Sequence, residues 1–142
     1  MDSYLTKRWL PIIIWLLIIF LASSNSMAGL YKILTSWALI GIPLYQLLIP
    51  LVHLAVFFIL TFFLARALNW RKNLSLLALL LAFLTSIFFT VAAEIYQNRI
   101  PGRGFDWDDL FMSGIGALLG VLGYVLWYII IMRKKEKDNL LI

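Results

Sequence analysis

Four long apolar runs dominate the chain, and short polar segments separate them. The runs extend over about residues 9–23, 49–68, 74–95 and 110–132. A helix needs ~20 mainly apolar residues to cross the hydrocarbon core of a bilayer. Each run therefore predicts one transmembrane helix, and the first and shortest run reaches that length by recruiting flanking residues.

The first run has a second interpretation, as a cleaved secretory signal peptide. Lys7 and Arg8 precede it like the basic region of such a peptide, and Ser26-Met27-Ala28 has the form of a cleavage site. We favour a retained transmembrane helix, partly because of the family resemblance described below.

The segment over about residues 30–46 is apolar but interrupted by Lys32, Gly41 and Pro43. Two complete spans and a turn do not fit between Gly29 and Leu68, because each span needs ~20 residues. Aromatic side chains such as those of this segment tend to lie at the level of the lipid head groups. We therefore predict an interfacial or re-entrant helix after the first span.

Composition supports a membrane protein with a single domain over residues 1–142. The chain is 63% hydrophobic and 13% charged, whereas about a quarter of the residues of a soluble domain are charged. The predicted fold is an all-α bundle of about four transmembrane helices. The chain has no Cys, which excludes disulfides, a thiolate nucleophile and a Cys-ligated cofactor. No cofactor is predicted.

The basic residues flank the apolar runs, so the net charge of +5 indicates membrane lipids rather than nucleic acid as partners. Four spans place Lys32, Arg99 and Arg103 on one side. The other side collects the remaining nine basic residues, which are Lys7, Arg8, Arg66, Arg71, Lys72, Arg133, Lys134, Lys135 and Lys137. Basic residues are enriched on the cytoplasmic side of membrane proteins. We predict a multi-pass protein of the bacterial cytoplasmic (inner) membrane, with both termini cytoplasmic.

The same topology brings the unusual polar residues to the outer face. His53 lies near the start of the second span, Glu94 and Gln97 near the end of the third, and Asp109 at the start of the fourth. Glu94 and Gln97 are three residues apart, so they share one face of a continuing helix. The turn that follows can fold Arg103 back toward Glu94 and Gln97. The sequence predicts a polar pocket here.

Asp106, Asp108 and Asp109 precede the fourth run. Acidic residues at this position usually cap the helix and complement its dipole, and this is the interpretation we favour. Carboxylates could also hold a divalent cation, but their spacing is not that of a known metal-binding loop. We predict no metal site.

The chain resembles the VanZ-like family of small bacterial membrane proteins. The resemblance rests on Glu94-x-x-Gln97, Pro101-Gly102-Arg103, Asp109, Gly116 and Gly120, together with His53 and the pair Ser23-Ser24. It covers about residues 20–120. The family's named member is associated with resistance to the glycopeptide teicoplanin, so the resemblance implies a protein of the cell envelope.

Three positions depart from that family. Ile49 and Pro50 stand where the family commonly has an Asp-Lys pair ahead of the histidine, and Ser113 stands where it often has Asn. If the Asp-Lys pair belongs to an active site, the activity of this chain is divergent.

Two functional hypotheses follow. In the first, Arg103, with Arg99, Gln97 and Asp109, binds an anionic lipid, a lipid-linked wall precursor or a glycopeptide. In the second, the protein is a membrane-embedded enzyme: His53 or Glu94 is the general acid or base, and Arg103 stabilises charge on a phosphoryl or acyl oxygen. The chain shows no evident nucleophile with a paired base, no Gly-rich phosphate loop and no zinc motif.

Gly116 and Gly120 form a GxxxG pattern in the fourth run. Such a small-residue face lets the backbone of another helix approach closely. The face can pack within the chain, which is the simpler use, or against a second copy in a homo-oligomer.

Overall fold

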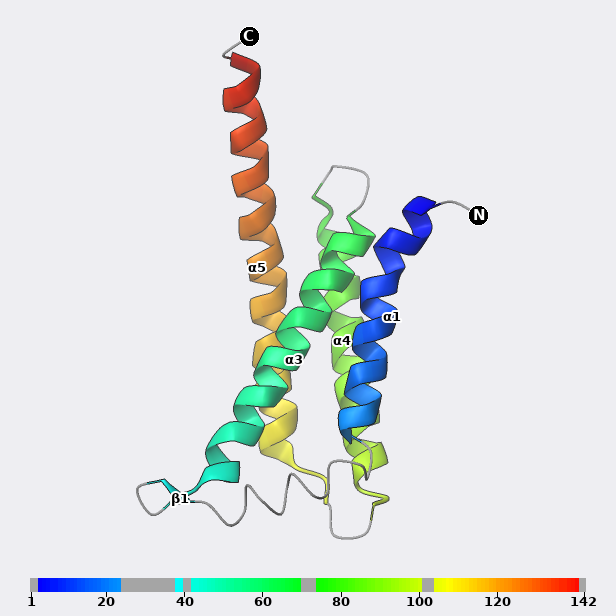
Figure 1. Cartoon of the computed structure of the whole chain (residues 1–142), viewed down its shortest axis with the longest axis vertical. Coiled ribbons are helices and arrows are strands. Elements are labelled where there is room, and N and C mark those ends of the chain that lie inside the picture. The colour runs from blue at the N-terminus through cyan, green and yellow to red at the C-terminus, as the bar shows by residue number, and fades with distance from the viewer. Residues whose placement is uncertain (1–2, 24–37, 40–41, 70–73, 101–103, 141–142) are drawn as a thin grey trace.

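The computed structural model describes residues 3–23, 38–39, 42–69, 74–100 and 104–140 (Figure 1). It contains the helices α1 (Ser3–Ser23), α3 (Leu44–Leu68), α4 (Leu76–Gln97) and α5 (Trp107–Leu140). These four helices are long and apolar enough to cross a membrane. The predicted all-α bundle of four transmembrane helices is confirmed.

Three helices begin before the apolar runs that predicted them, and two of these, α1 and α3, begin at least five residues early. α1 begins at Ser3 rather than at residue 9, and it includes Lys7 and Arg8. Basic residues are good helix formers and extend their charged ends to the membrane surface. α3 begins at Leu44 rather than at residue 49, with Pro50 inside the helix. Transmembrane helices tolerate proline because neighbouring groups satisfy the freed backbone atoms.

The predicted end of the last helix was too early. α5 continues to Leu140, beyond the basic residues at which the apolar run stops. Leaving the apolar core does not end a helix, and residues 133–140 contain neither Gly nor Pro. Figure 1 shows the C-terminal end of α5 projecting beyond the other helices.

Only a small part of the segment predicted as an interfacial helix is described, and there the prediction was wrong, because these residues form a short hairpin and the start of α3. Ala38–Leu39 (β1) pairs antiparallel with Ile42–Pro43 (β2), and α3 follows directly. Residues 24–37 and 40–41 lie outside the described residues, and so does Lys32.

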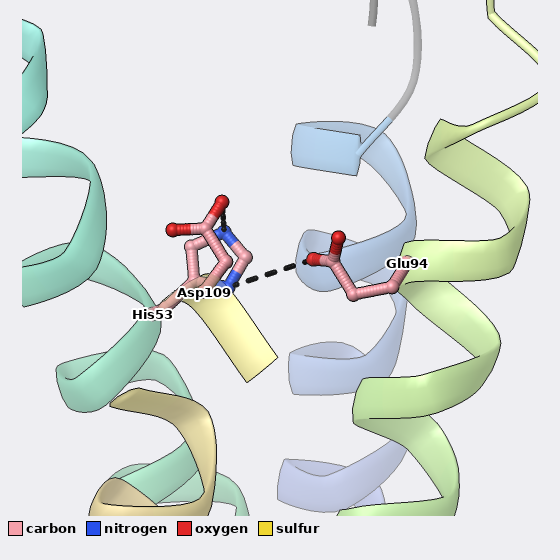
Figure 2. A group of neighbouring side chains, drawn as sticks. All are labelled: His53, Glu94 and Asp109. Carbon is pink, nitrogen blue, oxygen red and sulfur yellow. Dashed lines mark ion pairs between the residues drawn. The ribbon is translucent and has the colours of Figure 1, made fainter. Parts of the chain in front are cut away.

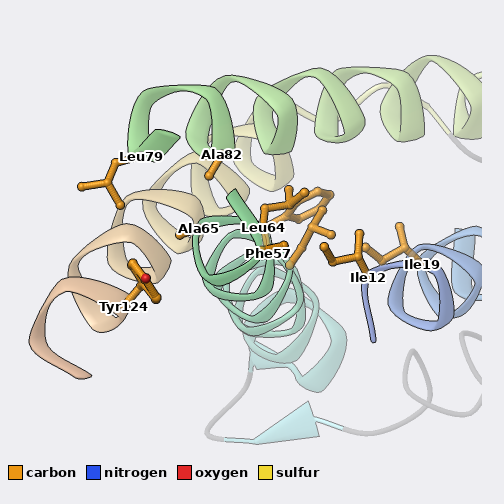
Figure 3. Packing of buried hydrophobic residues seen from close by; sticks show 10 residues of the cluster. Ile12, Ile19, Phe57, Leu64, Ala65, Leu79, Ala82 and Tyr124 are labelled. Carbon is orange, nitrogen blue, oxygen red and sulfur yellow. The ribbon is translucent and has the colours of Figure 1, made fainter. Parts of the chain in front are cut away.

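α3 is the central helix of the bundle, and it packs against α1, α4 and α5. Figure 3 shows Phe57 and Leu64 of α3 between Ile12 of α1 and Leu79 of α4. A buried hydrogen bond from Thr61 Oγ1 to Ser86 Oγ, 2.7 Å long, also joins α3 to α4. Hydrogen bonds of this kind hold helices together in lipid, where the hydrophobic effect does not.

The closest helix contact joins α3 to α5 through the predicted small-residue face. A Cβ atom added to Gly116 would overlap the backbone of Leu54, and one added to Gly120 would lie 2.5 Å from the carbonyl oxygen of Phe58. The Gly116/Gly120 face is therefore covered by α3 of the same chain. This contact sets how α5 is rotated against α3. The rotation in turn determines which polar side chains of the two helices meet.

Candidate functional site

Three ionisable side chains from three helices meet at one end of the bundle. His53 comes from α3, Glu94 from α4 and Asp109 from α5, and Figure 2 shows their side chains directed toward one another. Alternating spans predicted this end for all three residues. The structure brings them within ion-pairing distance.

The imidazole of His53 lies between the two carboxylates. Its Nε2 is 3.5 Å from Oδ2 of Asp109, and its Nδ1 is 4.0 Å from Oε1 of Glu94. The His53 side chain is 17% exposed, so the ring retains some access from outside the bundle. An imidazole flanked by carboxylates can accept a proton and hold the resulting charge.

Ser113 is a fourth member of the site, and sequence analysis did not place it there. Its Oγ lies 3.2 Å from Nδ1 of His53, and the residue is fully buried. Ser113 follows Asp109 by four positions, which puts both on one face of α5. That spacing was the signal that could have identified it. The pair thus faces both nitrogens of the ring.

Glu94 is the most deeply buried charged residue of the site, at 1% exposure. Its Oε2 accepts a hydrogen bond of 3.2 Å from the backbone N–H of Asp106. A buried carboxylate is costly unless it is hydrogen-bonded and faces a positive charge. Glu94 therefore ties the segment before α5 to α4, and its other oxygen faces His53.

The close approach of α3 and α5 positions His53. Leu54, whose backbone contacts Gly116, is the next residue after His53 on α3. Gly116 lies less than one helix turn after Ser113 on α5. Because no side chain separates the two backbones at this level, the imidazole reaches both Ser113 and Asp109.

The acidic residues at the start of α5 have different roles. Asp106 caps the helix, because its Oδ1 accepts a hydrogen bond of 2.8 Å from the N–H of Asp108. Asp108 is exposed, whereas Asp109 is 8% exposed and faces His53. The capping that we favoured from the sequence therefore applies to Asp106, and Asp109 belongs to the site.

Of the three aspartates considered from the sequence, only Asp109 belongs to a group of side chains that could hold a metal ion. His53, Glu94 and Asp109 each offer one ligand atom, and these atoms lie within 4.8 Å of one another. One imidazole nitrogen and two carboxylate oxygens form a donor set that suits zinc or manganese. Asp106 and Asp108 do not join this group.

A comparison with known families shows which family the protein belongs to. The profile of the VanZ/LLP1 family matches residues 8–130, most of the chain. The chain belongs to the VanZ-like family. No curated protein and no solved structure matches it.

The remaining predicted residues of this VanZ-like protein lie around the cluster or outside the described part. Gln97 is partly buried at the end of α4, and Arg99 is exposed just beyond it. The backbone N–H of Arg99 bonds to the carbonyl of Tyr96 in a turn that follows α4. Arg103 lies outside the described residues. Of the predicted site, the structure thus joins His53, Glu94 and Asp109, and it adds Ser113.

Proposed function

We propose that this VanZ-like protein carries out proton-transfer chemistry on a polar head group at the outer face of the bacterial cytoplasmic membrane. The observation that carries the proposal is the imidazole of His53, which lies 3.5 Å from Asp109 and 4.0 Å from Glu94. This arrangement supports the enzyme hypothesis more than binding alone, because binding an anion needs no pair of carboxylates.

In the proposed reaction, His53 accepts the proton of an attacking hydroxyl or water and then passes it to the leaving oxygen. Glu94 and Asp109 orient the ring and stabilise its protonated form. Arg103 and Arg99 hold the anionic part of the substrate and stabilise negative charge on its phosphoryl or acyl oxygen. Gln97 contributes a hydrogen bond to the same substrate.

The substrate class follows from the place of the site. The bundle end that carries His53 has a partly exposed imidazole and long apolar helices leading away from it. A substrate anchored in the outer leaflet would present its head group here. We propose an anionic envelope lipid or a lipid-linked wall precursor, with altered glycopeptide susceptibility as the consequence.

The orientation of the protein in the membrane is part of the proposal. Nine of the twelve basic residues lie on the side opposite His53 if the four spans alternate. The positive-inside rule then puts both termini in the cytoplasm and His53 at the outer face.

The test compares teicoplanin susceptibility in a sensitive Gram-positive host that expresses the wild type or a variant at equal membrane levels. We expect wild type to protect, and His53→Ala, Glu94→Gln and Arg103→Ala to abolish protection. Glu94→Gln keeps an oxygen for the N–H of Asp106 but removes the charge. Asp108→Asn is the matched control, because Asp108 is exposed and outside the cluster.

Lipid extracts of the same cells identify the substrate. A lipid whose abundance changes with wild type but not with His53→Ala is the expected finding by mass spectrometry. Full protection by Glu94→Gln would exclude its acid–base role. If Arg103→Ala alone abolished protection and no lipid changed, a binding protein without chemistry would be the correct function.

A further inference from the structure

A second polar site lies at the opposite end of the bundle, away from His53. It is a cleft of about 300 Å³ between the end of α3 and the second half of α5. Arg66 and Asn69 line it from the α3 side, and Tyr124, Trp127, Tyr128 and Lys135 line it from α5. Its volume is at the lower end of the range of small-molecule sites, ~300–1,000 Å³.

The charge of the cleft favours an anion. Arg66 and Lys135 both line it and both are exposed, and the lining residues in the described part of the chain include no acid. The guanidinium carbon of Arg66 lies 5.8 Å from the ring centroid of Trp127. This cation–π contact holds the guanidinium beside the cleft, and a guanidinium that contacts an aromatic ring can still donate its N–H groups to a ligand.

The floor of the cleft is formed by buried polar residues, and one of them is held by two hydrogen bonds. Asn69 donates a hydrogen bond of 2.9 Å to the carbonyl of Ala65 and accepts one of 2.7 Å from the N–H of Ser75. Asn69 and Tyr124 are 5% and 2% exposed. Two buried residues therefore lie beneath two exposed basic side chains at the opening.

The position of the cleft along the helices matches a membrane boundary. Arg66 lies in the last turn of α3, where the candidate span Leu48–Leu68 ends. Nineteen residues of α5 separate Tyr128 from Asp109, which is ~28 Å of helix. A bilayer core is ~30 Å thick, so the cleft lies at one head-group layer and the His53 cluster at the other.

The wall of the cleft also offers a surface for acyl chains. Ile131 and Met132 complete its lining. Leu126 and Ile130 on the same part of α5 are 61% and 65% exposed, as expected for side chains that face lipid tails. Basic residues above an apolar helix surface, with Tyr and Trp between them, are the arrangement that receives an anionic lipid.

We propose that this cleft binds the phosphate of an anionic phospholipid. Arg66 and Lys135 hold the phosphate, and the acyl chains lie along α5 beside Ile131. The site is separate from the His53 cluster and does not depend on the function proposed there. The orientation proposed above would place this lipid in the inner leaflet, and the binding of the lipid itself does not depend on that orientation.

Native mass spectrometry of the purified full chain in detergent tests whether the cleft binds an anionic phospholipid. The chain is measured with added phosphatidylglycerol, phosphatidylcholine or inorganic phosphate. We expect phosphatidylglycerol adducts on wild type, weaker phosphatidylcholine adducts and no retained phosphate. The double substitution Arg66→Gln with Lys135→Gln should weaken phosphatidylglycerol binding about 30-fold. The double substitution Arg66→Lys with Lys135→Arg keeps both charges and should retain most of the phosphatidylglycerol binding.

Lys134→Gln is the matched control. Lys134 is exposed and adjacent to Lys135, but it does not line the cleft. It should change phosphatidylglycerol binding by threefold or less. Equal loss in the control and the double variant would mean general charge attraction and overturn the site. Equal binding of phosphatidylcholine, or retention of inorganic phosphate alone, would overturn the anionic lipid as the occupant.

Discussion

The Oγ of Ser113 lies 3.2 Å from Nδ1 of His53, although the two residues are 60 positions apart in the chain. On the other side of the ring, Nε2 faces Oδ2 of Asp109 at 3.5 Å. A carboxylate can only accept a hydrogen bond, so Nε2 carries a proton when the two interact. Ser113 and Asp109 together orient the ring, and the carboxylate of Asp109 favours the tautomer with its proton on Nε2.

His53 is the only histidine of the chain, so ¹⁵N-histidine labelling gives NMR signals from this one ring. We predict a protonated Nε2 in wild type and a shifted Nδ1 signal in Ser113→Ala, because the hydroxyl at Nδ1 is lost. Loss of this bond should also lower the free energy of unfolding by ~1 kcal/mol. Asp108→Asn should leave the ring signals unchanged. An unaltered Nδ1 signal in Ser113→Ala would contradict the contact.

Gly116 and Gly114 provide a matched pair for the contact between α3 and α5. A methyl group at Gly116 overlaps the backbone of Leu54, whereas one at Gly114 meets only the Cδ1 of Ile87, 3.9 Å away. Gly116→Ala should cost about 1–3 kcal/mol by forcing the helices apart. Gly114→Ala should be neutral or stabilise the protein by up to ~1 kcal/mol, since Ala favours a helix.

Unfolding of both variants by SDS titration, followed by circular dichroism, measures this difference. Gly116→Ala should also change the His53 ring signals, because the separation moves His53 away from Ser113. Equal stability of the two variants would show that the close contact is absent.

The hydrogen bond between Thr61 and Ser86 is the third testable contact. It is buried, 2.7 Å long and joins α3 to α4. A double-mutant cycle with Thr61→Val and Ser86→Ala should give a coupling energy of about 0.6 kcal/mol, with ~1.7 kcal/mol as the upper bound. The same SDS titration measures it. Additive effects of the two substitutions would mean that the hydroxyls do not interact.

The orientation can be tested with single cysteines, because the natural chain has none. Asn98 is exposed beyond α4, and Glu136 is exposed near the end of α5. In intact cells, an impermeant maleimide should label Asn98→Cys. Glu136→Cys should be labelled only after permeabilisation. Labelling of both from outside would refute the four-span topology, and the reverse pattern would invert it.

The helices and their alternating directions in the bundle were predictable from local sequence alone. A transmembrane helix satisfies its own backbone hydrogen bonds, so run length and apolar content suffice to identify it. Alternation of four such spans then predicted that His53, Glu94 and Asp109 lie at one end. Prediction of helix ends was less accurate, as α3 and α5 show, because charged residues and Pro50 do not stop a helix at a membrane boundary.

Tertiary packing decided how each helix is rotated about its axis and which helices are neighbours. The GxxxG pattern indicated a close contact but not its partner, and only the packing of Gly116 on Leu54 identifies α3. That rotation brings Ser113 and Asp109 to His53 and leaves Asp108 exposed. The cleft at Arg66 arises in the same way, because it needs residues of two helices side by side. Side-chain shape across a helix interface sets these relationships, and no single helix contains that information.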